Sequence, residues 1–93
     1  MDDIIRVLLL KDGRTIVTKL EEVSDHEIGD PNCVMLDPVI YDTSIEEHSK
    51  ALQRFPGANV TADTKMAIRS EDILTMVTPA AKLLAEYLVT IGD

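Results

Sequence analysis

The side chains best suited to chemistry lie in two short acidic stretches and at one cysteine. The stretches are Asp25-His26-Glu27 and Glu46-Glu47-His48, whose residue types can bind divalent metals. Neither has a second ligand pair at a spacing known for metal sites, so solvated loop residues are the better interpretation. No spacing ties a histidine to Cys33 or to a serine, and no Gly-rich phosphate loop is present. We therefore expect no catalytic residue, no bound metal and no cofactor.

The charge is distributed unevenly along the chain. The formal net charge is −8, and the segment from Glu21 to Glu47 holds nine carboxylates without a lysine or arginine. The other residues carry nine basic and eight acidic side chains and are nearly neutral. Because binding to phosphates depends on clustered basic groups, this acidic block argues against nucleic-acid binding that ignores base sequence. It favours a solvated face or a docking surface for proteins.

Length and composition favour a single small domain, residues 1–93, with an aliphatic core. The chain has no Trp, one Phe and two Tyr. The lone Cys33 can form no internal disulfide, and we expect it to be a buried core residue. No apolar run approaches the roughly 20 residues needed to cross a bilayer, and the acidic N-terminus is unlike a signal peptide. These features predict a cytoplasmic, intracellular protein without membrane contact.

Five strands are expected from the apolar pattern. Asp12-Gly13 is typical of a hairpin turn, since Gly adopts the positive φ that a two-residue turn requires. Pro38 lacks an N–H and predicts a bulge or an edge position within the third strand. The expected strands are Ile4 to Leu10, Arg14 to Val23, Cys33 to Tyr41, Lys65 to Arg69 and Ile73 to Val77.

A long excursion, residues 42–63, separates the third and fourth strands. Ser44 and Glu47 have the spacing of a capping box, which predicts a short helix from about Ile45 to Arg54. An excursion of this length is longer than most connections and could form a partner surface.

A second helix is expected at the C-terminus, over residues 78–91. Thr78 suits the N-cap and Pro79 the first helical position. The apolar stripe of this helix comprises Leu84, Tyr87, Leu88 and Ile91. Together the elements predict an all-β fold with helical additions: a small, strongly bent, five-stranded barrel over residues 4–77, with one short helix in the excursion and one at the C-terminus.

Two stretches of the chain resemble the two halves of the motif of the Sm-like (LSm) proteins. The first half is matched by Leu9, Gly13, Ile16, Leu20, and Asn32 with the apolar residues after it; the second by Ile68-Arg69-Ser70 and then Ile73. The chain departs from the family pattern at Thr18 and Ser70, where the family usually has Gly. The loop before Asn32 is a few residues longer than in the family pattern. The expected terminal helix follows the last strand, whereas the family's helix precedes the first strand. The resemblance implies a bent, SH3-like barrel.

The resemblance also implies a homo-oligomer. Sm-like subunits join their edge strands into rings of about five to eight, which covers strand edges that would otherwise be exposed. Here residues 65–69 of one subunit would pair with residues 73–77 of the next. The interface residues expected from this arrangement are Met66, Ile68, Ile73, Leu74 and Met76.

By the same resemblance, short single-stranded RNA is an expected partner. In the family an Asn before the third strand contacts the base edge, and an Arg of the second motif packs beside the base. These roles fall to Asn32 and Arg69, with Ser70 beside them. The stacking role has no clear holder, because His26 has the only ring in that loop. The resemblance thus implies a role in RNA processing or RNA–protein assembly.

Two other interpretations stay open. A ring could serve protein assembly without RNA, with the acidic loops and the 42–63 excursion as docking surfaces, and this accounts better for the charge. RNA binding accounts better for Asn32 and Arg69. An unrelated SH3-like barrel would instead be a monomer.

Overall fold

A computed structural model describes residues 4–22, 32–57 and 59–92 of the chain. In this part of the chain, six strands, two α-helices and a 3₁₀ helix (η1) follow one another. They are β1 (Ile4–Leu10), β2 (Thr15–Glu22), β3 (Cys33–Tyr41), α1 (His48–Ala51), β4 (Leu52–Arg54), β5 (Lys65–Ile68), η1 (Ser70–Asp72), β6 (Ile73–Val77) and α2 (Ala81–Thr90). The five strands expected from the sequence are confirmed with the predicted bounds or within one residue of them.

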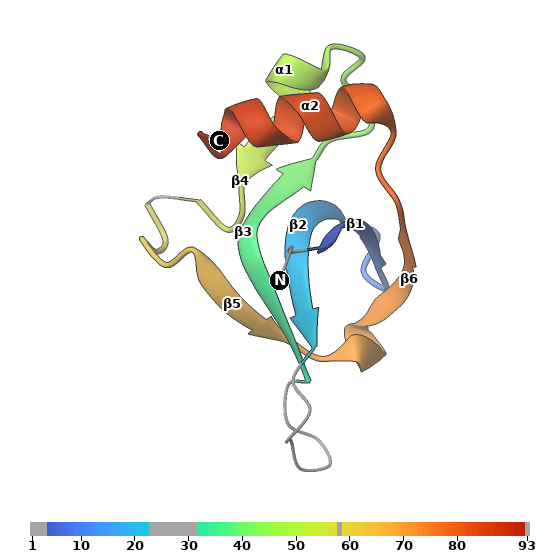
Figure 1. Ribbon diagram of the computed structural model, residues 1–93, viewed down its shortest axis with the longest axis vertical. Coiled ribbons are helices and arrows are strands. Elements are labelled where there is room, and N and C mark those ends of the chain that lie inside the picture. The colour runs from blue at the N-terminus through green and yellow to red at the C-terminus, as the bar shows by residue number, and fades with distance from the viewer. Residues whose placement is uncertain (1–3, 23–31, 58, 93) are drawn as a thin grey trace.

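The strands form one antiparallel sheet in the order β4-β3-β2-β1-β6, with β5 also paired to β3. β3 is long enough to hold two neighbours on one side: Cys33–Leu36 pairs with β5, and Val39–Tyr41 pairs with β4. Figure 1 shows β3 curving through the centre, with β5 beside its lower part and β4 beside its upper part. No ladder among the described residues joins β6 to β4 or β5, so the sheet is not closed there. The molecule is thus a mostly antiparallel sheet with a C-terminal helix.

The bend of β3 lies at a bulge opposite Thr18. Val17 pairs with Val39 and Lys19 with Leu36, so Thr18 alone faces the two residues Asp37 and Pro38. Asp37 has a φ of 51°, in the left-handed region that few non-glycine residues adopt. The bulge predicted for Pro38 is confirmed, and it bends β3 at the point where its neighbour changes from β5 to β4.

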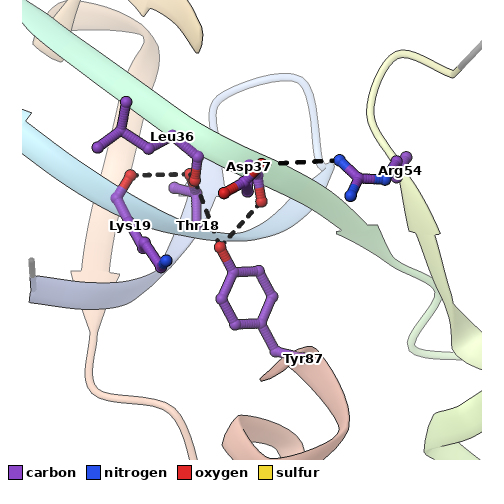
Figure 2. Close-up of polar contacts among 6 residues, drawn as sticks. All are labelled: Thr18, Lys19, Leu36, Asp37, Arg54 and Tyr87. Carbon is purple, nitrogen blue, oxygen red and sulfur yellow. Dashed lines mark hydrogen bonds and ion pairs between the residues drawn. The ribbon is translucent and has the colours of Figure 1, made fainter. Parts of the chain in front are cut away.

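Buried polar contacts hold this bulge (Figure 2). The Tyr87 hydroxyl, carried by α2, lies 2.9 Å from the carbonyl oxygen of Asp37 and 3.3 Å from that of Leu36. Thr18 is fully buried, and its hydroxyl lies 3.0 Å from the same Leu36 oxygen. On the outer side, Arg54 pairs with the Asp37 carboxylate at 3.7 Å. The bend and the docked helix therefore depend on each other.

Alternate residues of the strands enter two separate clusters, one on each face of the sheet. One face is covered by α2 and contains Val7, Val17, Val39, Leu52, Leu83 and Tyr87. The other face contains Leu8, Leu10, Ile16 and Met35. Five partly buried residues pack against this second cluster: Leu20, Phe55, Met66, Ile68 and Ile73. Cys33 is buried, as expected.

The excursion between β3 and β5 differs from its prediction. The helix expected from Ile45 to Arg54 is confined to His48–Ala51, because the chain then runs as β4 along β3 and gains ladder hydrogen bonds there. The predicted capping box is also wrong. Ser44 bonds to the Asp42 carboxylate, while Glu47 is the N-cap and makes no side-chain capping bond.

The C-terminal helix exists but starts later than predicted. Its N-cap is Ala80, not Thr78. Tyr87 is fully buried, and Leu88 and Ile91 pack against the first cluster as the predicted stripe requires. Leu83, which the stripe omitted, is also buried. No helix in the described ranges is long and apolar enough to cross a membrane.

Candidate functional site

The structure brings together the two loops that the sequence linked to RNA binding. Asn32 lies just before β3, and Ser70 opens η1, 38 positions later. The Asn32 amide nitrogen donates to Ser70 Oγ at 2.9 Å, and the Ser70 backbone N–H donates to Asn32 Oδ1 at 2.8 Å. Both residues are near the surface. We call this contact the Asn32–Ser70 junction.

The serine at position 70 has a direct part in this junction. Its Oγ accepts the bond from Asn32, and a Gly at this position would have no side-chain atom to do so. These two bonds within the protein occupy Oδ1 of Asn32 and one hydrogen of its side-chain amide. The amide that the resemblance assigns to a base is therefore held in place by η1.

Arg69 lies beside the junction but faces acidic groups. Its side chain is 51% exposed, and Nε lies 4.0 Å from the Asp72 carboxylate. Glu71 is also exposed on η1. One guanidinium next to two carboxylates makes a weak electrostatic site for phosphate. His26, the only ring expected near a bound base, lies outside the described residues.

The predicted interface residues divide into two groups. Met66, Ile68 and Ile73 point into the protomer, where they pack against the second cluster. Leu74 and Met76 lie on the surface, 69% and 42% exposed, and Val77 next to them is 45% exposed. The ladder between β6 and β1 shifts register at Leu9 and Leu10, which allows Ile73 to face the core while Leu74 faces solvent. β6 is thus an edge strand with an apolar surface.

A cleft of about 420 Å³ opens beside β5. Its apolar lining consists of Ala67 and of five residues that belong to the second cluster or pack against it: Leu10, Ile16, Met35, Phe55 and Ile68. Arg14 lies over the Phe55 ring, 5.0 Å from its centre, and is paired with Asp12 at 2.6 Å. Hydrogen bonds from Arg14 lower the pKa of Asp12, so this rim pair stays ionised. We call this the Phe55 cleft.

The cleft could not be predicted from the sequence, because no local pattern indicates where Phe55 lies. The sequence indicated only that the chain leaves a helix after about Arg54, whereas the structure places Phe55 beside Pro38, with its backbone N–H 3.1 Å from the Pro38 carbonyl oxygen. The available signal was a single aromatic residue in the excursion.

Comparison with known proteins places the chain in a family. Residues 3–92 match the model of a family described as a family of unknown function, DUF6561. The chain belongs to this family. No curated protein matches the DUF6561 chain.

Side chains suited to metal binding are dispersed in the described part of the DUF6561 chain. In the described ranges, no three His, Cys, Asp or Glu side chains gather as a metal site would require. Burial, together with the charge of Glu22, raises the pKa of the Cys33 thiol. A buried thiol with a raised pKa is a poor nucleophile, because attack requires the thiolate. The arrangement is suited to strand pairing and to contacts at the junction.

Proposed function

We propose that the DUF6561 chain is an Sm-like subunit that assembles with copies of itself through the edges β5 and β6, and that its function is to provide this assembly as a platform for other proteins. Two features of the fold support an Sm-like subunit. The lower part of the sheet has the order β5-β3-β2-β1-β6, and η1 is the only link between β5 and β6. The first motif spans β1 to β3, and the second spans η1.

The exposure of β6 carries this proposal. Within the described chain its only strand partner is β1, and three of its five residues are exposed apolar side chains. Natural proteins usually protect an edge strand with charge, proline or a covering segment. The strand itself has no charged residue. Pairing with another subunit would cover both its backbone and its side chains.

The mass in solution tests this proposal. Light scattering coupled to size exclusion should give five to eight times the chain mass of 10.3 kDa for a ring. Leu74→Asp should reduce that mass, because a carboxylate would be buried in the paired edge. Val89→Asp on α2 is the matched control, since Val89 is 70% exposed and lies away from both edges. A wild-type species of 10.3 kDa at all concentrations would disprove the proposal.

Single-stranded RNA is a second candidate function, favoured by the Asn32–Ser70 junction. Two loops distant in sequence meet there, and they carry the three residues that the resemblance assigns to RNA: Asn32, Arg69 and Ser70. Against this, Arg69 has acidic neighbours, and the whole chain carries a net charge of −8. RNA binding would therefore be selective for bases and weak for the phosphate backbone.

Fluorescence anisotropy with labelled oligo(U), oligo(A) and single-stranded DNA at low and physiological salt tests this second function. Micromolar binding that prefers one base and is lost in Arg69→Ala would support it. Arg54→Ala is the matched control, because Arg54 is similarly exposed but belongs to β4 and pairs with Asp37. Absence of binding at low salt would leave the assembly function alone.

A further inference from the structure

The bulge of β3 makes contacts with several segments that are distant in sequence. The Asp37 backbone N–H donates to the Thr64 carbonyl oxygen at 2.7 Å, just before β5 begins. The Phe55 N–H donates to the Pro38 carbonyl oxygen at 3.1 Å, just after β4 ends. Tyr87 of α2 directs its hydroxyl at the same bulge, as Figure 2 shows. The bulge therefore joins α2 to the start of β5.

One side chain of α2 stabilises the unusual conformation at Asp37. The Tyr87 hydroxyl lies 2.9 Å from the Asp37 carbonyl oxygen and 3.3 Å from that of Leu36. Successive carbonyl groups of a regular strand point to opposite sides, so one hydroxyl can approach both only where the strand is distorted. The distortion is the φ of 51° at Asp37, which costs free energy in a non-glycine residue and persists where surrounding contacts hold it.

The Leu36–Asp37 peptide group transmits this conformation to β5. The peptide is planar and trans, so its C=O and N–H point in opposite directions. The carbonyl oxygen lies 3.0 Å from the Thr18 hydroxyl and close to the hydroxyl of α2, while the N–H donates to Thr64. Holding the carbonyl toward these hydroxyls therefore directs the N–H at Thr64. The adjacent pair, Leu36 with Lys65, begins the ladder of β5.

We propose that α2 positions β5 through the bulge, and that Tyr87, which lies in neither edge strand, thereby sets the strength of assembly. The second part of this inference rests on the proposed assembly function and adds a residue outside the edges that controls it. β5 has four residues, and within the described chain its only strand partner is β3. A short edge strand opens locally at low cost, so the bond at its first turn into the sheet matters.

The apolar side chains of α2 and of β5 belong to different clusters. Tyr87 is part of the first cluster, whereas Met66 and Ile68 pack against the second. Loss of packing under α2 would therefore lower the stability of the whole fold without acting on β5 in particular. Loss of the Tyr87 hydroxyl, in contrast, acts at the residue that bonds to the start of β5.

Hydrogen exchange followed by mass spectrometry tests whether α2 positions β5. Every variant carries Leu74→Asp in addition, so that monomers are compared, and light scattering checks this. Tyr87→Phe should raise the exchange of the amides in residues 64–68 roughly fivefold, the factor that corresponds to one net hydrogen bond. Leu83→Ala is the matched control, because Leu83 is a buried residue of the same helix and the same cluster.

The two variants separate positioning from general stabilisation. Leu→Ala in a core lowers global stability more than the loss of one hydroxyl does, so a purely structural role predicts the larger rise in β5 exchange for Leu83→Ala. Positioning predicts the larger rise for Tyr87→Phe, and the opposite order would make the inference wrong. Thr18→Val removes the other hydroxyl from the Leu36 carbonyl and should act as Tyr87→Phe does. It replaces Tyr87→Phe if that variant does not fold.

Dilution followed by light scattering, without Leu74→Asp, tests the effect on assembly. Tyr87→Phe should dissociate at a concentration roughly fivefold higher than the wild type, by the same loss of one bond, and Leu83→Ala should shift it less. Raised exchange in β5 with unchanged assembly would disprove the second part of the inference. A wild type that is monomeric at all concentrations would overturn the assembly function itself, and the exchange experiment would still decide whether α2 positions β5.

Discussion

The face of the sheet under α2 and the side bounded by β5 and β6 are built from the same strands but covered to very different degrees. Under α2, the side chains of Val17, Val39 and Tyr87 are fully buried. On the other side, a cleft reaches the second cluster, and β6 presents Leu74 to solvent. In the first region, α2 covers the apolar side chains. In the second region, no described segment covers the cleft or Leu74.

The difference indicates that stability and interaction are located in separate regions. The helix-covered region combines apolar burial with the hydrogen bonds of Tyr87 at the bend of β3, so its loss should unfold the molecule. The open region has charged rims and exposed apolar side chains around the buried residues of the second cluster. Changes there should alter association while leaving the folded monomer intact.

Replacing Tyr87 by Ala should have the largest effect on stability. Truncation of a fully buried aromatic side chain costs about 3–5 kcal/mol, which is a large share of the free energy of unfolding of a small domain. Leu74→Ala, in the open region, should change monomer stability by no more than about 0.5 kcal/mol. Urea unfolding followed by circular dichroism measures both. Equal losses for the two variants would mean that the regions are not separate in stability.

Replacing Tyr87 by Phe should have a smaller effect and isolates the hydroxyl. The ring stays in place, but the Asp37 carbonyl loses the bond of 2.9 Å, while the Leu36 carbonyl keeps its contact with Thr18. We expect a loss of about 1 kcal/mol, the usual net contribution of one hydrogen bond. A shift of the urea midpoint at unchanged slope would show it. A loss as large as that of Tyr87→Ala would assign the whole stabilisation to the polar contact.

The strands were predictable from sequence because their signals are local. Asp12-Gly13 fixes a turn, apolar alternation fixes a strand, and Pro38 marks an interruption of one. The sequence could not predict β4, because Leu52–Arg54 becomes a strand only through its pairing with β3. A capping-box pattern at Ser44 favoured a longer helix, and tertiary pairing overrode it.

The candidate site was predictable only where a motif linked distant residues. The resemblance identified Asn32 and Ser70 together, and the structure places them in contact. Nothing in the sequence placed Phe55 beside Arg14, because this contact depends on the path of β4. Likewise, alternation alone could not distinguish the inward Ile73 from the outward Leu74, since the register shift opposite Leu9 and Leu10 decides it.

Replacing Asp12 by Asn should give the smallest effect, and it tests whether the rim of the Phe55 cleft contributes to the fold. Hydrogen bonds from Arg14 lower the pKa of Asp12 in the folded protein. A carboxyl with a lowered folded pKa stabilises the fold above its unfolded pKa, near 3.9, and this contribution is lost as the pH falls through the folded value. The variant should therefore be slightly less stable at neutral pH and lose less stability below about pH 4.

Asp42→Asn gives the comparison in the helix-covered region, because bonds from Ser44 lower the pKa of Asp42 in the same manner. Both residues are exposed, so both acid slopes should change little and by similar amounts. Urea midpoints across the acid range measure the slopes, at protein concentrations low enough to keep the chain monomeric. At protein concentrations where the chain assembles, a change in the acid slope of Asp12→Asn but not of Asp42→Asn would place the rim of the Phe55 cleft in the contact between copies. An acid slope of Asp12→Asn identical to the wild type under both conditions would remove this rim pair from both the fold and the interface.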